Sequence, residues 1–217
     1  MWLKGNHIKA VLFDVDGTLL DTSIGITHSV RYTLEKLGLQ KLSEDTLRKF
    51  VGPPPQEAFQ KYVELSKEEA QRAANVYREF YKKEALFEAS VYEGILSLLE
   101  RLKQNGYKIG VATYKREDYA LDILRHFGIS PYCEVIHGAD NENKLTKADI
   151  IDLCCVELGV PKSNIMLVGD TEHDAIGAYR AGVKFCAVTW GFGYKPDEVA
   201  SNYPIALICN DPNSLTR

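Results

Sequence analysis

The sequence predicts an α/β protein: a Rossmann-like parallel sheet with helices on both faces, plus an all-helical domain inserted after the first strand. Short apolar runs recur along the chain, and most are separated by segments with helical periodicity. The runs are almost continuously apolar, as expected for strands covered on both faces. The stretch between the first two runs, roughly residues 21–90, contains no convincing strand.

The first predicted strand covers residues 8–13. Five further runs have the length and composition of buried strands, at residues 107–113, 133–138, 164–170, 184–190 and 205–210. Between them, apolar residues recur at helical spacing, for example at Ile95, Leu98, Leu99 and Leu102. Strands that alternate with helices of this length favour a parallel sheet.

The segment after the first strand is too long for a single crossover, which needs only a dozen or so residues. Its helical signals are the apolar face from Ile26 to Leu37 and a capping box at Ser66 and Glu69, which opens a long helix toward Ala85. The prolines of "GPPP" at residues 52–55 require a loop or turn. We therefore predict a core of residues 1–20 and 88–217 and a helical cap of residues 21–87.

The bulk composition narrows the function classes. The chain has 217 residues, 45% hydrophobic and 26% charged, which is ordinary for a globular protein. A net charge of −4 gives no general basis for binding nucleic acid or an anionic membrane. No apolar run approaches the roughly 20 residues of a membrane span. Five cysteines without a CxxC motif, and a start without a signal peptide, predict a cytoplasmic location.

Chemically useful side chains gather where the predicted strands end. In an open parallel sheet, sites form beyond the carboxyl ends of the strands. Four successive ends carry such groups: Asp14 and Asp16; Thr113, Tyr114 and Lys115; Asp140, Lys144 and Lys147; and Asp170, Glu172 and Asp174. This convergence predicts a site at that edge of the sheet.

The residue types indicate a cation and a phosphate. Acids crowded at one edge repel each other, and a divalent cation would relieve the repulsion. Mg²⁺ prefers few carboxylates, several waters and a phosphate oxygen. Thr113 and Lys147 would complete a phosphate site by offering a hydroxyl and an ammonium group. Taken singly, however, a residue such as Thr113 is more often a helix cap, and one such as Lys147 is usually a solvated helix residue.

Other interpretations of the same motifs are weaker. "DVDG" fails as an EF-hand calcium loop, because the sixth and twelfth positions are Leu19 and Gly25. A plain Asp-rich turn, and a helix N-terminus at "GDTEHD", would each explain some of the acids but not their convergence. "GFGYKP" at residues 191–196 lacks the third glycine of a dinucleotide fingerprint, and we discount it.

Together these residues resemble the haloacid dehalogenase-like hydrolase superfamily. "DVDGTLLDT" at residues 14–22 resembles its first motif, DxDGT, and "GDTEHD" at residues 169–174 its fourth, GDxxxD. Thr113 falls where the second motif has a Ser or Thr, and a lysine near the start of the helix after the third predicted strand resembles the third motif. The insertion, with "FVGPPPQEAF" at residues 50–59, is similar to the helical cap of the phosphoglycolate phosphatase-like branch.

The resemblance implies a chemical role for each acid. Asp14 would attack phosphorus and form an aspartyl-phosphate. Asp16 would protonate the leaving alcohol and then deprotonate the attacking water. Asp14, the main-chain carbonyl of Asp16, and Asp170 would hold Mg²⁺, with Asp174 in support. An acid at Asp16 favours phosphate esters, since haloacid dehalogenases and phosphonatases lack one there.

The remaining expected contacts concern the substrate. Thr113, Lys147 and the main chain at Gly17 would bind the phosphoryl oxygens. Lys147 suits the helix start better than Lys144, which lies one turn earlier. Tyr114 stands where a small polar residue is usual, and it lines the expected phosphate pocket. Two further cations, Arg48 and Lys115, are either contacts to the organic part of the substrate or plain surface charges.

We therefore expect a Mg²⁺-dependent phosphatase for a small phosphorylated metabolite, either phosphoglycolate-like or nucleotide-like. Neither nucleic acid nor a membrane is an expected partner, and the chain would be a monomer or weak homodimer. Two alternatives stay open on the same residues. One is a phosphomutase acting on a sugar phosphate, and the other is a catalytically weak binding or regulatory protein.

Overall fold

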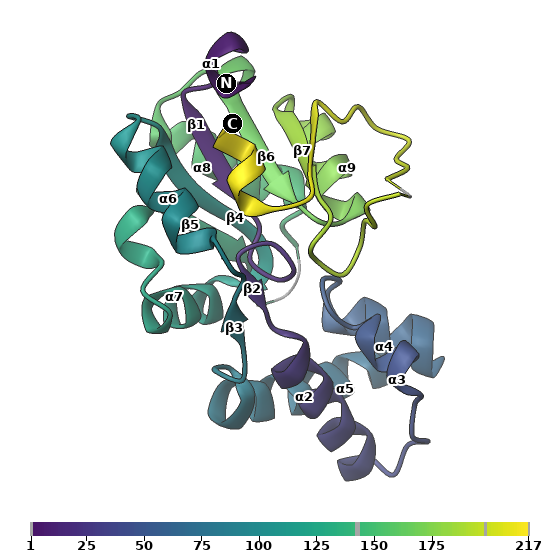
Figure 1. Cartoon of the computed structure of the whole chain (residues 1–217). Helices are drawn as coiled ribbons and strands as arrows, with labels where there is room; N and C mark the ends of the chain where they lie inside the picture. Colours follow the sequence, from purple (N-terminus) through teal and green to yellow (C-terminus); the bar gives the residue numbers. More distant parts are fainter. Residues whose placement is uncertain (1, 142–143, 198, 217) are drawn as a thin grey trace. The chain divides into compact units, whose positions relative to one another are not determined.

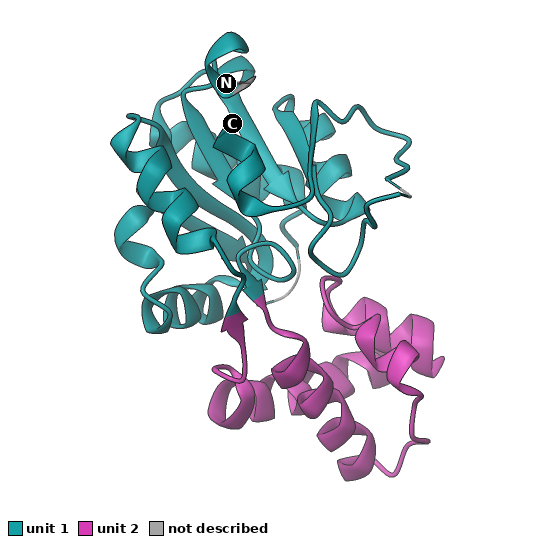
Figure 2. Ribbon diagram, viewed as in Figure 1, with its two compact units in different colours: residues 1–20, 91–217 teal, residues 21–90 magenta. Residues whose placement is uncertain are grey.

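The computed structural model describes residues 2–141, 144–197 and 199–216 (Figure 1). The chain divides into two compact units, one formed by Met1–Leu20 and Val91–Arg217 and the other by Asp21–Ser90 (Figure 2). The boundary predicted after residue 87 therefore falls a few residues before the boundary at Ser90.

The larger unit contains a six-stranded parallel sheet in the order β5-β4-β1-β6-β7-β8. Its strands are β1 (Ala10–Phe13), β4 (Lys108–Arg116), β5 (Val135–Ala139), β6 (Ile165–Gly169), β7 (Lys184–Val188) and β8 (Leu207–Cys209). In the central register, Ala10 pairs with Lys108 on one side and Ile165 on the other. The predicted α/β class with a parallel sheet is confirmed.

Helices cover both faces of this sheet (Figure 1). They are α1 (Trp2–Gly5), α6 (Ile95–Gln104), α7 (Glu117–His126), α8 (Lys147–Leu158) and α9 (Glu172–Ala181), with short 3-10 turns at Ser130–Tyr132, Lys162–Asn164 and Pro212–Thr216. Helices α8 and α9 pack on each other and share one apolar core with the sheet. The predicted stripe on α6 is fully buried, at Ile95, Leu98, Leu99 and Leu102.

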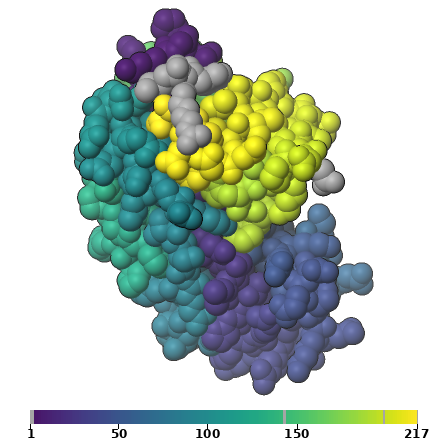
Figure 3. All heavy atoms as spheres, viewed as in Figure 1, coloured from purple at the N-terminus to yellow at the C-terminus, as the bar shows by residue number. Residues whose placement is uncertain are grey.

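The C-terminal turn closes against α6. Arg101 donates from Nε to Thr216 Oγ1 at 3.3 Å and from Nη2 to Asn213 Oδ1 at 2.9 Å. Figure 3 shows the yellow C-terminal segment lying directly against the teal segment that contains α6. Among the described residues, no helix combines the length and apolar character that a membrane span requires.

The smaller unit is helical. It contains α2 (Ser23–Lys36), α3 (Glu44–Arg48), α4 (Pro55–Val63) and α5 (Lys67–Phe80), followed by a π-helical turn at Tyr81–Ala85. The capping box is present: Glu69 N donates to Ser66 Oγ at 3.3 Å and Ser66 N to the Glu69 carboxylate at 2.9 Å. The helix expected to reach Ala85 therefore changes its hydrogen-bond pattern at Tyr81.

Two very short strands, β2 (Leu20–Asp21) and β3 (Ser90–Val91), pair where the chain passes between the units. The sequence showed no strand in residues 21–90, because two residues are too few to carry a periodic pattern.

Strand β4 also differs from its prediction, since it continues past Thr113 to Arg116. Its register with β5 moves from Ala112 opposite His137 to Arg116 opposite Ala139, so residues 113–115 form a bulge. Bulges re-aim side chains and are common beside functional sites. The polar residues of this bulge gave the sequence the appearance of a strand end.

The burial of β1 makes a stability prediction. Leu12 is 0% exposed in the central strand, so Leu12→Ala should lower the free energy of unfolding by about 2–5 kcal/mol through lost burial and a cavity. Urea unfolding followed by circular dichroism measures this. The matched control is Leu121→Ala, because Leu121 is 37% exposed. An equal loss in both variants would contradict the assigned core.

Candidate active site

Three aspartates and one lysine meet at the carboxyl end of the sheet. Asp14 directly follows β1 and Asp170 directly follows β6, while Asp174 and Lys147 lie in the first turns of α9 and α8. One carboxylate oxygen from each of the three aspartates lies within 4.8 Å of the others. All four side chains are buried. Two adjacent parallel strands therefore deliver acids to one point, as the sequence pattern predicts.

Lys147 is the cation of this cluster. Its Nζ lies 2.7 Å from Asp14 Oδ1 and 2.7 Å from Asp174 Oδ1. Burial opposes the ammonium charge, but Asp14 and Asp174 outweigh burial and raise the pKa of Lys147 above its ordinary value. Lys144, the alternative phosphate-binding lysine, is exposed and is not among the residues that meet here.

Burial and the neighbouring acids destabilise the charged forms of Asp14 and Asp170. Burial, assisted by Asp174 and Asp16, raises the pKa of Asp14 to about 6 despite the attraction of Lys147. Burial, followed by the charges of Asp174 and Asp14, raises the pKa of Asp170 to about 8. The carboxylates would accept a bound cation readily, because it would offset the same burial and repulsion.

Asp170 is oriented by the loop after β7, which contains the "GFGY" segment at residues 191–194. The main-chain N–H groups of Phe192 and Gly193 donate to Asp170 Oδ2 at 2.7 and 3.2 Å, and Tyr194 N donates to the Asp170 carbonyl at 2.8 Å. A Cβ on Gly191 would overlap the Asp170 carboxylate and the Gly17 carbonyl. "GFGY" was discounted as a nucleotide motif. Its glycines after a strand nevertheless signal close backbone approach.

The loop after β1 approaches Asp170 from the other side. Gly17 has a φ of 80°, and a Cβ there would overlap the Asp170 carboxylate. Thr18 Oγ1 donates to Asp170 Oδ1 at 3.4 Å, and Trp190 Nε1 donates to the Thr18 carbonyl at 3.0 Å. Loops from β1 and β7 thus hold the Asp170 carboxylate between them.

Asp174 connects the cluster to helix α9. Its Oδ2 accepts from Thr171 N at 3.1 Å and Thr171 Oγ1 at 2.7 Å, while its Oδ1 binds Lys147. One Asp174 oxygen therefore caps the helix, and the other pairs with Lys147 in the cluster.

The bulge in β4 supplies the second motif. Thr113 is buried, and its Oγ1 accepts from Lys115 N at 3.1 Å. The Tyr114 hydroxyl accepts from Lys147 N at 2.9 Å, so it satisfies a main-chain donor at the start of α8. Lys115 Nζ lies 3.0 Å from Asp16 Oδ1, and both residues are buried.

Arg48, the other expected substrate contact, lies in α3 of the helical unit and is exposed. Its role toward a substrate stays a prediction.

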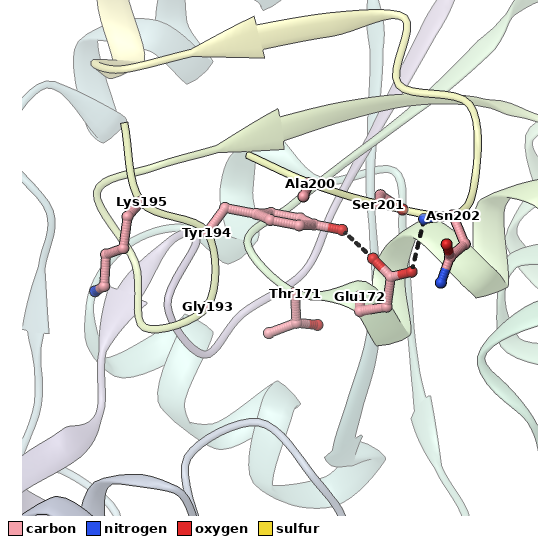
Figure 4. A pocket seen from close by; sticks show the side chains of 8 residues that line it. All are labelled: Thr171, Glu172, Gly193, Tyr194, Lys195, Ala200, Ser201 and Asn202. Atoms are coloured by element: carbon pink, nitrogen blue, oxygen red, sulfur yellow. Dashed lines mark hydrogen bonds between the residues drawn. The ribbon is translucent and has the colours of Figure 1, made fainter. Parts of the chain in front are cut away.

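A cavity of about 560 Å³ lies between the start of α9 and the segments at residues 193–195 and 200–202 (Figure 4). Glu172 points into it, where its carboxylate accepts from the Tyr194 hydroxyl at 2.8 Å and from Asn202 N at 3.4 Å. Burial and Glu172 raise the pKa of Tyr194 above its ordinary value. Glu172, the second acid of "GDTEHD", therefore belongs to the wall of this pocket and is not one of the three clustered aspartates.

A parallel α/β sheet that carries buried carboxylates, a lysine and a hydroxyl at its carboxyl edge defines an enzyme that handles an anionic group beside a cation. The comparison with known protein families narrows that class. The family model described as haloacid dehalogenase-like hydrolase matches residues 11–188. The chain belongs to this family, and the resemblance drawn from its motifs is confirmed.

Individual relatives extend over nearly the whole chain. A 5'-nucleotidase of Pseudomonas aeruginosa is 35% identical over 195 residues, covering 89% of this chain and 88% of that protein. The tyrosine-protein kinase PtkA of Mycobacterium tuberculosis is 36% identical over 190 residues, covering 87% of this chain but only 65% of PtkA. The crystal structure of a predicted phosphatase from Clostridium acetobutylicum is 37% identical with a TM-score of 0.87, covering 96% of both chains.

The family and its phosphatase-named relatives make this chain a phosphatase of the haloacid dehalogenase-like kind. Its cluster of three aspartates can hold a metal ion, as hydrolases of this kind generally require a divalent cation.

Metal binding should depend on pH. Protons occupy Asp14 and Asp170 below their raised pKa values of about 6 and about 8. A cation must displace those protons, so Mg²⁺ affinity should rise by up to about tenfold per pH unit between pH 6 and 8. Isothermal titration calorimetry in buffers of different ionisation enthalpy should show proton release. Asp170→Asn is the control. An affinity that does not change with pH would contradict the assigned ligands.

The glycine loop should be needed for metal affinity. Gly191→Ala forces a methyl group into the Asp170 carboxylate. Mg²⁺ affinity should fall by about tenfold or more, which is the usual effect of removing a hydrogen-bond partner from a metal-binding residue. The control is Gly5→Ala, where a Cβ would meet nothing within 4 Å. Equal affinity in the two variants, measured by calorimetry, would exclude a role for the loop.

Proposed function

We propose that the protein is a Mg²⁺-dependent phosphatase that hydrolyses a small phosphate monoester through an aspartyl-phosphate on Asp14. The observation that carries the proposal is the position of Asp14: its carboxylate is bound to a buried lysine and lies beside two further buried acids. A nucleophile in this environment meets an anionic phosphate only if cations offset its own charge.

The donor set fits Mg²⁺. Oxygens of Asp14, Asp170 and Asp174 lie within 4.8 Å of one another. In this proposal Asp14, Asp170 and the main-chain carbonyl of Asp16 would hold the ion, with Asp174 in support. A small number of carboxylates leaves coordination positions for water and a phosphate oxygen, which Mg²⁺ favours. When bound, the ion would neutralise charge on the transferred phosphoryl group.

The protein groups then divide the reaction into two displacements. An Asp14 oxygen attacks phosphorus, the bond to the ester oxygen breaks, and Asp16 gives its proton to the departing alcohol. Asp16 next takes a proton from water, which attacks the aspartyl-phosphate, releases inorganic phosphate and restores the Asp14 carboxylate. Each step is easier than direct hydrolysis.

Two side chains are suited to bind the phosphoryl oxygens. The Lys147 ammonium has its position fixed between Asp14 and Asp174. The Thr113 oxygen accepts the N–H of Lys115, which leaves the hydroxyl proton for donation to phosphate. The main-chain N–H of Gly17, the third expected donor, instead donates to the Leu20 carbonyl at 2.9 Å. Positioning and charge stabilisation dominate phosphoryl transfer, and this set provides both.

The relatives support the proposed substrate class. A 5'-nucleotidase among the relatives favours a nucleoside monophosphate, and a phosphoglycolate-like ester is the other member of the proposed class. In this proposal, the helical unit serves as the cap, with Arg48 directed to the organic part. The protein acts as a monomer or weak homodimer. The five free thiols fit a cytoplasmic location.

The nucleophile can be tested directly. Phosphate release from a panel of monoesters with Mg²⁺ should fall at least about 10⁴-fold in Asp14→Asn, because the attacking oxygen is lost. Acid quench of the wild type with radiolabelled substrate should trap labelled protein, and Asp14→Asn should trap none. Asp118→Asn is the control, since the Asp118 side chain is 42% exposed and its carboxylate pairs with the neighbouring Arg116.

Three outcomes would contradict the proposal. Near-wild-type turnover in Asp14→Asn would exclude Asp14 as the nucleophile. Isomerisation of a sugar phosphate without phosphate release would establish the phosphomutase alternative. Absence of turnover across the panel would favour a binding or regulatory protein.

A further inference from the structure

Asp16 has its own buried lysine. Lys115 Nζ lies 3.0 Å from Asp16 Oδ1, and the two side chains are 4% and 10% exposed. Asp16 comes from the loop after β1 and Lys115 from the bulged end of β4, and these two strands are neighbours in the sheet. The pair is therefore built from rigid elements of a single compact unit.

The burial of Lys115 requires an explanation. A lysine near the edge of a sheet ordinarily extends its long side chain so that the ammonium reaches water. Taking an ammonium and a carboxylate out of water costs several kcal/mol per ion unless their geometry repays it. Here the β4 bulge keeps the ammonium at the catalytic edge. Such an arrangement is not the one expected of a surface charge.

We propose that Lys115 is a positioning residue: its ammonium holds Asp16 Oδ1 and so orients the carboxyl group, which in its protonated form gives a proton to the substrate's leaving oxygen and as the carboxylate then takes one from water. The inference rests on the proposed function, since it concerns the acid–base group of that reaction. It replaces the expectation that Lys115 contacts the organic part of the substrate.

The site then contains two separate charge pairings. Lys147 binds Asp14 and Asp174, the acids beside the phosphoryl group. Lys115 binds Asp16, the acid beside the leaving group. Removal of Lys115 should therefore disturb the proton transfer and leave phosphoryl binding unchanged.

Leaving groups of different basicity separate these two effects. An alkoxide leaves only if it receives a proton, so glycerol 2-phosphate depends on Asp16 during formation of the aspartyl-phosphate. A p-nitrophenolate leaves without a proton. Because kcat/KM reports the steps through departure of the leaving group, the ratio of kcat/KM for the two substrates measures the quality of the acid.

The test variant is Lys115→Met, which keeps the length of the side chain and removes its charge. Its kcat/KM for glycerol 2-phosphate should fall about 30-fold or more, and for p-nitrophenyl phosphate less than about threefold, since general acid catalysis contributes on the order of 10²–10⁴. The matched control is Lys108→Met, a half-exposed lysine at the other end of the same strand. It should stay within about twofold of wild type on both substrates.

A double-mutant comparison tests whether Lys115 acts through Asp16. Asp16→Asn combined with Lys115→Met should be no slower than Asp16→Asn alone, because residues that act as a unit lose their effect together. This variant also removes both charges of the buried pair, so it folds without an uncompensated carboxylate. Circular dichroism melting of every variant confirms the fold before kinetics are compared.

Several results would overturn the inference. An equal loss on both substrates would show a purely structural role, and a rise in KM with unchanged kcat would show a substrate contact. A further loss when Lys115→Met is added to Asp16→Asn would show that Lys115 acts elsewhere. Failure of the wild type to release phosphate from either ester would instead contradict the proposed function, and the inference with it.

Discussion

The catalytic end of the sheet depends on the compensation of negative charge, because four buried aspartates gather there. Asp14, Asp16, Asp170 and Asp174 are all buried, and each would repel its neighbours if left alone. Two lysines, one on α8 and one on β4, form ion pairs with three of them, and main-chain N–H groups donate to Asp170. The raised pKa values of Asp14 and Asp170 show that the compensation is incomplete, which is the property a cation site needs.

This compensation explains several details of the backbone. The β1 loop must pass close to Asp170, and Gly17 permits it. The loop after β7 must bring its N–H groups to the same carboxylate, and Gly191 permits that approach. Strand β4 must carry a buried lysine to its end, and a bulge provides the space. The irregular parts of the core therefore occur where the charges are.

Repeating sequence patterns predict the sheet and the acidic cluster. Apolar runs and helical stripes located the parallel sheet, and acids after β1 and β6 located the cluster. The bulge was missed because Tyr114 and Lys115 interrupt the apolar pattern that marks a strand. The role of residues 191–194 was missed because it depends on main-chain groups, which leave no side-chain signature beyond two glycines. The partner of Lys115 depends on pairing between strands far apart in sequence.

One consequence concerns the way the chain is assembled. The groups of the proposed reaction all lie in Met1–Leu20 and Val91–Arg217, whereas the helical unit is one uninterrupted segment, Asp21–Ser90. That segment begins and ends within the paired two-residue strands β2 and β3. A single genetic exchange between relatives could therefore replace the helical unit in one event. Selectivity could diversify in this way while the catalytic machinery is inherited intact.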